Sequence, residues 1–325
     1  MHVMGGGDVG GAKTHIMNMV TGLAKRNEVM LLSFRDGPFA DEARERGIDV
    51  RVIERHNPFR AAHTMRDLVD EFKPDIIHCH GGRANLMGAM VRRSREVPIL
   101  TTVHSDYRLD YLGSPLKQHT LGTANAIALR FLDFYQPVAD RMARTLIERG
   151  FDPERIVKIY NGMDFKRPEG EFDRASYLKE TFGAEIEDGD VLCGIAARLT
   201  AVKDIATTVR GFAEALKTAP QLRLFIAGDG EDADMLKKLC DQLGVRGRVT
   251  FCGWVPVEPF FRAMDINLLS SVSETFPYSI LEGVCAGCAT ICSEVGGMPE
   301  LIDTGENGYI FPVGDDKKLA EYMAR

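Results

Sequence analysis

Residues Ser273–Gly287 have the sequence SETFPYSILEGVCAG, which predicts a loop that leads into a short helix. Ile280 and Val284 recur at helical spacing, and Gly287 is a typical helix stop. Pro277 suits the first helical position, because the first N–H of a helix has no partner within the helix. The free N–H groups at that end carry about half a positive charge, so this stretch predicts an anion-binding helix end beside the loop.

The same stretch carries two carboxylates, Glu274 before the helix and Glu282 within it. Glu274 is placed to meet a polar ligand at the helix end. Glu282 lies about two helical turns further on, so it can reach a second part of the same ligand. Alternatively, Glu274 caps the helix and Glu282 faces solvent. This stretch alone leaves both interpretations open.

Short apolar segments alternate with helical patterns throughout the chain. In the first half, the predicted strands are residues 2–4, 29–34, 50–53, 75–79, 98–103 and 135–139. In the second half, they are residues 191–196, 222–227, 249–251, 266–269, 290–292 and 309–311. Continuously apolar strands that alternate with helices are typical of parallel sheets covered on both faces.

Two series of strands imply two domains. The turn signal Asn161-Gly162 and the charged segment Phe165–Arg174 separate the two series. We therefore expect an α/β protein with two doubly wound, Rossmann-like domains, residues 1–165 and 166–325. Ligands of such domains bind at the carboxyl ends of the strands, which predicts a cleft between the domains.

The composition restricts the classes of function. The chain has 325 residues, 45% of them hydrophobic and 27% charged, as in ordinary globular proteins. Its net charge of −7 argues against a nucleic-acid partner, because phosphates require a basic surface. The seven cysteines fall mostly in apolar runs, which indicates reduced thiols in a cytoplasmic protein. No apolar segment approaches the ~20 residues of a membrane span, and no signal-peptide pattern opens the chain.

Two glycine-rich loops match the dinucleotide fingerprint. They are Gly5-x-Gly7-x-x-Gly10 and Gly228-Asp-Gly230-x-x-Ala233. Glycine lets the backbone approach a ligand closely, but a tight strand-to-helix turn explains either loop equally well. A dinucleotide site also needs an acidic residue at the tip of the next strand, and neither loop is followed by one there.

Arg198 and Lys203 follow the predicted strand 191–196 and precede a helix. Positive charge is unfavourable near the start of a helix, so an anion at the carboxyl end of the strand explains both side chains better. Asp204 is better suited to capping the helix than to chemistry.

Three histidines stand at strand ends. His104 ends strand 98–103, while His78 and His80 form an H-x-H string at the end of the preceding strand. The string is compatible with a metal site, but no carboxylate lies nearby in the sequence, so a structural or acceptor-side role is favoured. The two D-x-D strings, at Asp188 and Asp232, do not follow strands. No metal is expected.

Glu274-x7-Glu282, with Phe276 and Pro277 between, resembles the nucleotide-sugar motif of the retaining family-4 glycosyltransferases, which have the GT-B architecture. Further segments resemble that family in the same order along the chain: Gly10-Gly11, His104, Asn161–Asp164, Arg198-x4-Lys203, Trp254-Val255 and Gly296–Glu300. Met163 replaces the β-branched residue usual in the family's NG-[IV]-D element.

The resemblance implies a metal-independent, retaining transfer of a sugar from a UDP- or GDP-linked donor, with no cofactor. It implies the catalytic residues His104, Arg198, Lys203 and Glu274. It implies the donor-binding residues Gly10, Gly11, Gly228, Trp254, Val255, Phe276, Pro277 and Glu282. Within this set, Arg198 and Lys203 clamp the diphosphate, and His104 contacts the sugar. Trp254 either stacks at the base or fills the domain core.

The acceptor is left open by the sequence: a glycan, a lipid or a small molecule. The loop Ser105–His119, with Tyr107, Arg108, Tyr111 and Lys117, is the expected acceptor site. A lipid acceptor would imply at most peripheral contact with the inner membrane face. Three other functions stay possible at this stage: a nucleotide-sugar epimerase or hydrolase, an NAD-dependent Rossmann enzyme, and a non-catalytic sugar-nucleotide binding protein.

Overall fold

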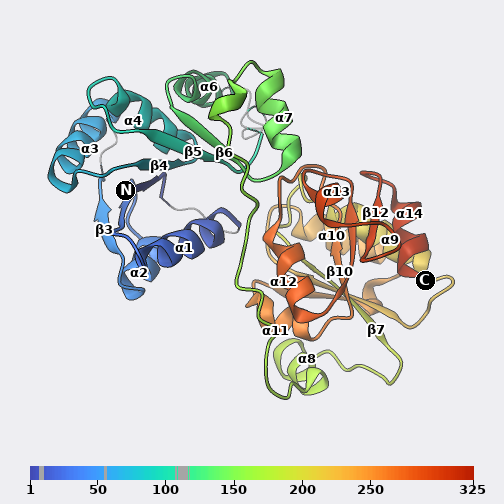
Figure 1. Cartoon of the computed structure of the whole chain (residues 1–325). Coiled ribbons are helices and arrows are strands. Elements are labelled where there is room, and N and C mark those ends of the chain that lie inside the picture. Colours follow the sequence, from blue (N-terminus) through green and yellow to red (C-terminus); the bar gives the residue numbers. More distant parts are fainter. Residues whose placement is uncertain (7–10, 55–56, 107, 109–115, 117) are drawn as a thin grey trace. The chain divides into compact units, whose positions relative to one another are not determined.

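Two six-stranded parallel sheets organise the part of the chain that the structure, a computed structural model, describes: residues 1–6, 11–54, 57–106, 108, 116 and 118–325 (Figure 1). The chain divides into two compact units, Met1–Gly162 and Met163–Arg325, and each unit holds one sheet. The α/β fold class expected from the alternating pattern is confirmed.

The sheet of the first unit has the strand order β3-β2-β1-β4-β5-β6. Its strands and helices are β1 (His2–Met4), α1 (Gly11–Ala24), β2 (Met30–Ser33), α2 (Pro38–Glu45), β3 (Asp49–Val52), α3 (Pro58–Phe72), β4 (Ile77–His80), α4 (Gly82–Arg92), β5 (Ile99–Val103), α6 (Thr123–Leu129), β6 (Phe134–Pro137) and α7 (Asp140–Glu148). The three-residue β1 lies in the middle of the sheet, where β2 and β4 pair with it on either side. A very short strand is sufficient there, because both neighbours satisfy its backbone groups.

The sheet of the second unit has the order β12-β11-β10-β7-β8-β9. Its strands and helices are α8 (Arg174–Phe182), β7 (Val191–Ala196), α9 (Ile205–Ala215), β8 (Leu222–Ala227), α10 (Ala233–Gln242), β9 (Val249–Gly253), α11 (Val257–Arg262), β10 (Ile266–Leu269), α12 (Tyr278–Ala286), β11 (Ala289–Ser293), α13 (Met298–Leu301), β12 (Tyr309–Phe311) and α14 (Asp316–Met323). The predicted bounds of β7, β8, β10 and β12 match the structure.

Strand β8 shows why the apolar runs are continuous. Its side chains alternate between two hydrophobic cores: Leu224 and Ile226 pack with residues of α9, α10 and α14, while Phe225 and Ala227 pack with residues of α8 and α11. A strand that is covered by helices on both faces has no polar face. Because helices cover both faces of the sheet, the loops at the carboxyl ends of the strands are the part that can meet a ligand.

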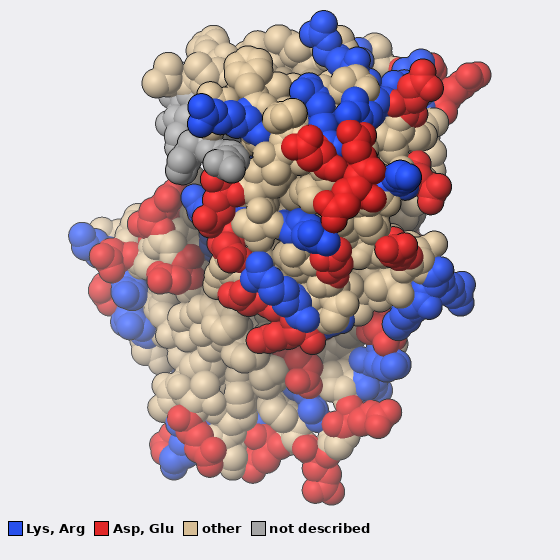
Figure 2. Space-filling view, turned by 90° about the vertical axis from the view of Figure 1, so that its left-hand side faces the viewer, with Lys and Arg blue, Asp and Glu red and all other residues tan. Residues whose placement is uncertain are grey.

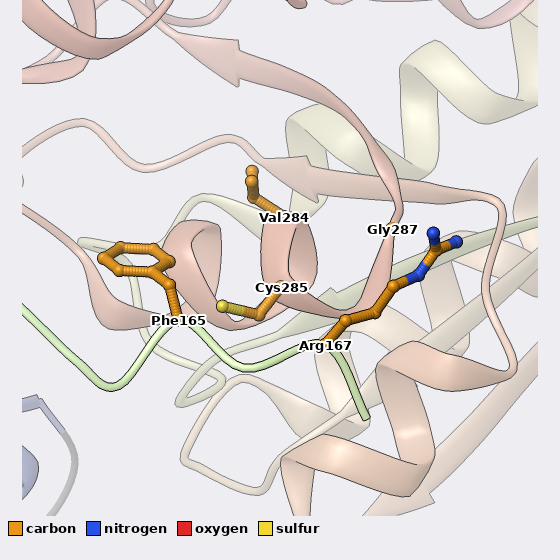
Figure 3. A pocket seen from close by; sticks show the side chains of 5 residues that line it. All are labelled: Phe165, Arg167, Val284, Cys285 and Gly287. Atoms are coloured by element: carbon orange, nitrogen blue, oxygen red, sulfur yellow. The ribbon is translucent and has the colours of Figure 1, made fainter. Parts of the chain in front are cut away.

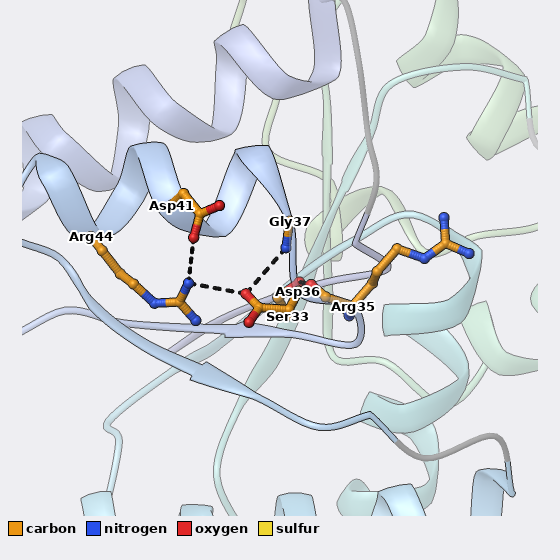
Figure 4. Close-up of polar contacts among 6 residues, drawn as sticks. All are labelled: Ser33, Arg35, Asp36, Gly37, Asp41 and Arg44. Carbon is orange, nitrogen blue, oxygen red and sulfur yellow. Dashed lines mark hydrogen bonds and ion pairs between the residues drawn. The ribbon is translucent and has the colours of Figure 1, made fainter.

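Short-range polar contacts hold the turn after β2 (Figure 4). Arg44 on α2 donates to Asp36 at 3.0 Å and to Asp41 at 2.7 Å, and the Gly37 N–H donates to Asp36 at 3.1 Å. The Arg44 guanidinium lowers the pKa of the Asp36 carboxyl. The side chain of Arg35 points away from this group. Exposed ion pairs add little stability, so these contacts mainly fix the course of the turn.

Charged side chains of both signs are interspersed on the face drawn in Figure 2, where Lys and Arg lie among Asp and Glu. That face therefore lacks the one-signed basic field that nucleic-acid binding requires. Among the described residues, none of the helices combines the length and the apolar character of a membrane span.

Candidate functional site

The loops after β7 and β10 are joined by hydrogen bonds in the second unit. The Val272 N–H donates to the Val202 carbonyl at 2.9 Å, and Ser270 Oγ donates to the Lys203 carbonyl at 3.1 Å. Thr208 on α9 in turn donates to Ser270 Oγ at 2.8 Å. β7 and β10 are adjacent in the sheet, so residues that are 70 positions apart in sequence meet at one edge.

Lys203 and Glu274 form an ion pair at this edge. The Lys203 ammonium donates to Oε1 of Glu274, and Ser271 Oγ donates to the same oxygen at 2.7 Å. The side chains are 24% and 13% exposed. The predicted contact of Lys203 with an anionic ligand stays a prediction, and the structure adds that the Glu274 carboxylate already contacts the ammonium group. An ammonium group has three donors, so this pair leaves donors for an anion.

Ser270 and Ser271 also belong to this site, although no sequence motif indicated them. Both hydroxyls are buried and follow directly after β10. The sequence does contain a signal for them: two polar residues directly follow an apolar strand just before Glu274, and buried polar groups need hydrogen-bond partners. Their partners, in the Lys203 and Glu274 loops, could not be identified from sequence.

Arg198 is exposed, and among the described residues it makes no side-chain hydrogen bond or ion pair. It lies two residues beyond the end of β7. Asp204 caps α9, because its side chain accepts from the N–H of Thr207 at 3.4 Å and from the Thr207 hydroxyl at 2.6 Å. The capping role predicted for Asp204 is confirmed. Because the Arg198 guanidinium is exposed, it is available to contact the predicted anion.

The helix predicted from residues 273–287 is α12. It begins at Tyr278, so Pro277 is the N-cap residue and stands one position earlier than expected. No side chain of a described residue caps this end. Phe276 and Pro277 are both buried, and their contact with the donor stays a prediction. Gly287 ends the helix in the left-handed conformation (φ 93°), as predicted.

Glu282 on α12 is partly buried, and among the described residues it has no hydrogen-bond or ion-pair partner. Burial raises the pKa of its carboxyl. The alternative of a fully solvated helix glutamate is therefore wrong. A partly buried carboxylate without a partner is unfavourable unless a ligand satisfies it.

Two glycines allow backbone segments to pack against the cationic and acidic loops. A Cβ on Gly228 (φ +128°) would lie 1.9 Å from the Ala197 carbonyl oxygen, next to Arg198. A Cβ on Gly296 (φ +51°) would lie 2.3 Å from the Glu274 carbonyl oxygen. Close backbone packing therefore explains both positions, and the donor contact of Gly228 stays a prediction.

Trp254 follows β9 and is 83% exposed, so the idea that it fills the domain core is wrong. Val255 is partly buried and packs against the core under α8 and α11. The Gly228 N–H donates to the Gly253 carbonyl at 2.7 Å, which ties this segment to the loop after β8. An exposed indole at the carboxyl edge of a sheet is available for stacking.

In the first unit, five histidines of the described residues form a cluster: His15 on α1, His2 on β1, His78 and His80 on β4, and His104 just after β5. The rings of His78 and His80 lie 4.3 Å apart and those of His15 and His104 lie 4.7 Å apart. Burial lowers the pKa of His2 and His104 to about 3 and that of His15 to about 4, and it holds those of His78 and His80 well below 6.5. All five are therefore neutral near pH 7.

The glycine loop and the acceptor loop are only partly described. Gly10 lies outside the described residues, as do Tyr107, Tyr111 and Lys117. Gly11 is exposed and is the first residue of α1. Arg108 is exposed, and its N–H donates to Asp106 at 2.9 Å.

A shallow pocket of about 360 Å³ lies against the last turn of α12 (Figure 3). Val284, Cys285 and Gly287 line it together with Phe165 and Arg167 from the segment before α8. Phe276 and Pro277 stand at the opposite, N-terminal end of α12, whereas Glu282 lies only three residues before Cys285. Among the described residues, those that line the pocket include none of the predicted donor residues.

Family models match both units. Residues 9–167 match the model described as Glycosyltransferase Family 4, and residues 179–325 match the model described as Glycosyl transferases group 1. Together the two models account for nearly the whole chain.

Curated relatives point to the same family. The chain is 28% identical over 258 residues to an uncharacterized glycosyltransferase of Methanocaldococcus jannaschii, covering 75% of this chain and 64% of the relative. It is 26% identical over 272 residues to N-acetyl-alpha-D-glucosaminyl L-malate synthase of Bacillus anthracis, covering 80% and 67%. The matched part thus spans about two thirds of the length of these relatives.

Solved structures share the fold. HepE of Anabaena, solved in complex with UDP-glucose, aligns with a TM-score of 0.84 over 99% of this chain and 88% of its own, at 22% identity. WaaG, a glycosyltransferase involved in lipopolysaccharide biosynthesis, aligns with a TM-score of 0.73 over 100% and 90%, at 15% identity. The sheets, the two family models and these likenesses agree: the chain belongs to the group 1 glycosyltransferases and has the GT-B fold.

Proposed function

We propose that the chain transfers a sugar from a nucleotide-diphosphate donor to an acceptor hydroxyl, with retention of configuration and without a metal ion at the diphosphate. One observation carries the proposal. The Lys203–Glu274 pair and the start of α12, which no side chain in the described ranges caps, occupy the same carboxyl edge of the second sheet. Such an edge is where nucleotide ligands bind in doubly wound folds.

The physical demand is to stabilise the leaving group. As the bond between the sugar and the diphosphate breaks, its electron pair goes to the diphosphate oxygen. Arg198, Lys203 and the N–H groups at the start of α12 are the groups assigned to offset that charge. Each preorganised donor of this kind contributes about 3–4 kcal/mol of transition-state stabilisation in comparable sites.

Glu274 is assigned to the transferred sugar. Its Oε1 is occupied by Lys203 and Ser271, which leaves Oε2 for a sugar hydroxyl or for the positive charge that develops on the ring. The acceptor oxygen bonds to the anomeric carbon from the face that the diphosphate leaves, and its proton goes to the departing diphosphate oxygen. Attack from this face retains the configuration without a covalent intermediate on the enzyme.

Glu282 and Trp254 are assigned to the nucleoside. The free carboxylate of Glu282 suits the two ribose hydroxyls, which can both donate to it. Trp254 presents its indole for stacking on the base, beside the backbone of Val255. Both roles rest on the family resemblance, on the exposure of Trp254, and on the fact that no described residue pairs with Glu282.

The first unit is assigned to the acceptor. His104 at the end of β5 orients the transferred sugar, and the backbone at Gly11 lies beside it, as the resemblance implies. The acceptor itself is a glycan, a lipid or a small molecule, and the relatives' names do not decide among them.

Glu282→Gln should weaken donor binding with little change in turnover at saturating donor. The amide keeps the size of the side chain, but it replaces an acceptor-only group that can take two ribose hydroxyls. We expect KM for the donor to rise about tenfold. Glu180→Gln, an exposed glutamate on α8, is a control of the same type within the second unit. A fall in kcat at unchanged KM would show that Glu282 has another role.

The proposed reaction is tested with a panel of UDP-, GDP- and ADP-sugars. UDP-glucose and UDP-N-acetylglucosamine come first, because HepE was solved with UDP-glucose and the Bacillus anthracis relative is named for an N-acetylglucosaminyl group. A thermal-shift screen identifies the donor, since a ligand that binds only the folded state raises the Tm. Nucleotide release is then measured with and without candidate acceptors.

The outcomes separate the alternatives. Release of nucleotide that depends on an acceptor, unaffected by a chelator, supports the proposal. Conversion of the donor without an acceptor would instead indicate a hydrolase or an epimerase. Tighter binding of NAD(H) than of any nucleotide sugar would favour an oxidoreductase. Binding of a donor without turnover against any acceptor class would indicate a binding protein.

A further inference from the structure

Three imidazoles of the histidine cluster converge on one point. His15 from α1, His80 from the end of β4 and His104 from the end of β5 each bring one ring nitrogen to within 4.8 Å of the others. These residues are 24 to 89 positions apart in the sequence, and the proposed sugar transfer uses only His104. Their shared position in the first unit therefore needs its own explanation.

Within the part of the chain that the structure describes, two of these rings hold a buried nitrogen without a hydrogen-bond partner: Nδ1 of His80 and Nε2 of His104. Nε2 of His80 lies 3.3 Å from Nδ1 of His2, so a single hydrogen is shared between those two atoms. If His80 donates it, the Nδ1 of His80 is a lone pair. Leaving such a buried polar atom unsatisfied costs about 1–3 kcal/mol, which points to a ligand at this position.

The donor set suits a metal ion, because each of the three imidazole rings places one nitrogen within 4.8 Å of the others. Neutral imidazole is the commonest protein ligand for zinc and its neighbours in the periodic table.

We propose that His15, His80 and His104 bind one transition-metal ion of the zinc class, with a fourth position left for water or hydroxide. Three histidines with one open position are a known donor set for Zn²⁺. The inference goes beyond the proposed function and does not depend on it, because binding is measured without any sugar. It gives the ion no part in the loss of the diphosphate.

A second group of histidines, His2, His78 and His80, has nitrogens equally close together. There, however, Nε2 of His78 already lies 2.7 Å from the Thr102 hydroxyl, and Nδ1 of His2 faces His80. These contacts resemble outer-sphere support, in which a second partner fixes a ring and its tautomer. The structure therefore favours the group that includes the two unsatisfied nitrogens.

The test is a Co²⁺ titration of the full chain, purified without a polyhistidine tag and stripped with a chelator, at about pH 7.5. Tetrahedral Co²⁺ gives intense visible bands, and octahedral Co²⁺ is pale. We expect one Co²⁺ per chain with the intense spectrum, and loss of the bands when Zn²⁺ is added. His15→Gln and His104→Gln should weaken binding at least tenfold. His63→Gln, an exposed histidine on α3, is the matched control and should bind as the unmodified chain does.

His80→Gln is a third variant, and circular dichroism checks that it folds, because His80 is almost completely buried. The other two variants carry the test if it does not. Three outcomes would overturn the proposal: a pale octahedral spectrum, binding that is lost equally in His63→Gln, and binding that survives in both His15→Gln and His104→Gln. The third, combined with loss of binding in His2→Gln, would move the ion to the second group of histidines.

Discussion

Lys203→Ala should lower turnover about a hundredfold while the chain stays folded. The ammonium has two tasks in the proposed site: it offsets the charge on the departing diphosphate, and it holds Oε1 of Glu274. Removing one preorganised donor from such a site typically costs a factor of 10² to 10³ in kcat, or about 3–4 kcal/mol. The measurement is kcat with saturating donor and acceptor, once the donor panel has identified them.

The two tasks of Lys203 can be separated by a double-mutant cycle with Glu274→Gln. If Lys203 acts only by holding Glu274, adding Lys203→Ala to Glu274→Gln should change nothing further. If it also contacts the diphosphate, as we propose, the double variant should be at least tenfold slower than Glu274→Gln alone. Equal rates would remove Lys203 from the diphosphate site.

A matched control for this cycle is Lys217→Ala. Lys217 also pairs with a glutamate, Glu214, but both side chains are exposed on the surface of the second unit. Exposed pairs contribute little, so this variant should keep full activity and its Tm. Unaltered turnover in folded Lys203→Ala, as in the control, would contradict the proposed mechanism.

The first unit should unfold as the pH falls from 6.5 toward 5. The histidines His2, His15 and His104 have folded-state pKa values of about 3, 4 and 3, below their ordinary value of 6.5. Below pH 6.5 the unfolded chain therefore binds protons that the folded chain excludes. The contribution of these neutral histidines to the free energy of unfolding is fully present above pH 6.5 and is lost as the pH decreases.

The magnitude is large for one unit. Each histidine that stays neutral in the folded state lowers the free energy of unfolding by about 1.4 kcal/mol per pH unit well below pH 6.5. Three of them together lower it by about 6 kcal/mol at pH 5. A domain is typically stable by about 5–15 kcal/mol in total. His78 and His80 add to the loss in the same direction, since burial also lowers their pKa values.

The second unit provides an internal control, because residues 163–325 contain no histidine. Hydrogen exchange followed by mass spectrometry reports the two units separately. With a chelator present, peptides of residues 1–162 should lose protection between pH 6.5 and 5, while peptides of residues 163–325 keep theirs. Equal loss in both units, or full protection of the first unit at pH 5, would show that the histidines do not control its stability.

The sequence by itself determined the fold class and most strand positions. Apolar runs such as Leu222–Ala227 mark strands that helices cover on both faces, and that signal is local. The same is true of α12, with its proline at the start and Gly287 at the end. The spacing between Glu274, before that helix, and Glu282, within it, could also be read from the sequence, and so could the family that this spacing indicates.

Only the tertiary structure decided which of these residues meet. The pairing of Lys203 with Glu274 depends on β7 and β10 being neighbours, and the histidine cluster depends on β1, β4 and β5 lying side by side. Strand order is set by packing across the whole domain, and local periodicity does not encode it. The exposure of Trp254 was undecided for the same reason: an aromatic residue after a strand is compatible with core or surface until the neighbouring elements are in place.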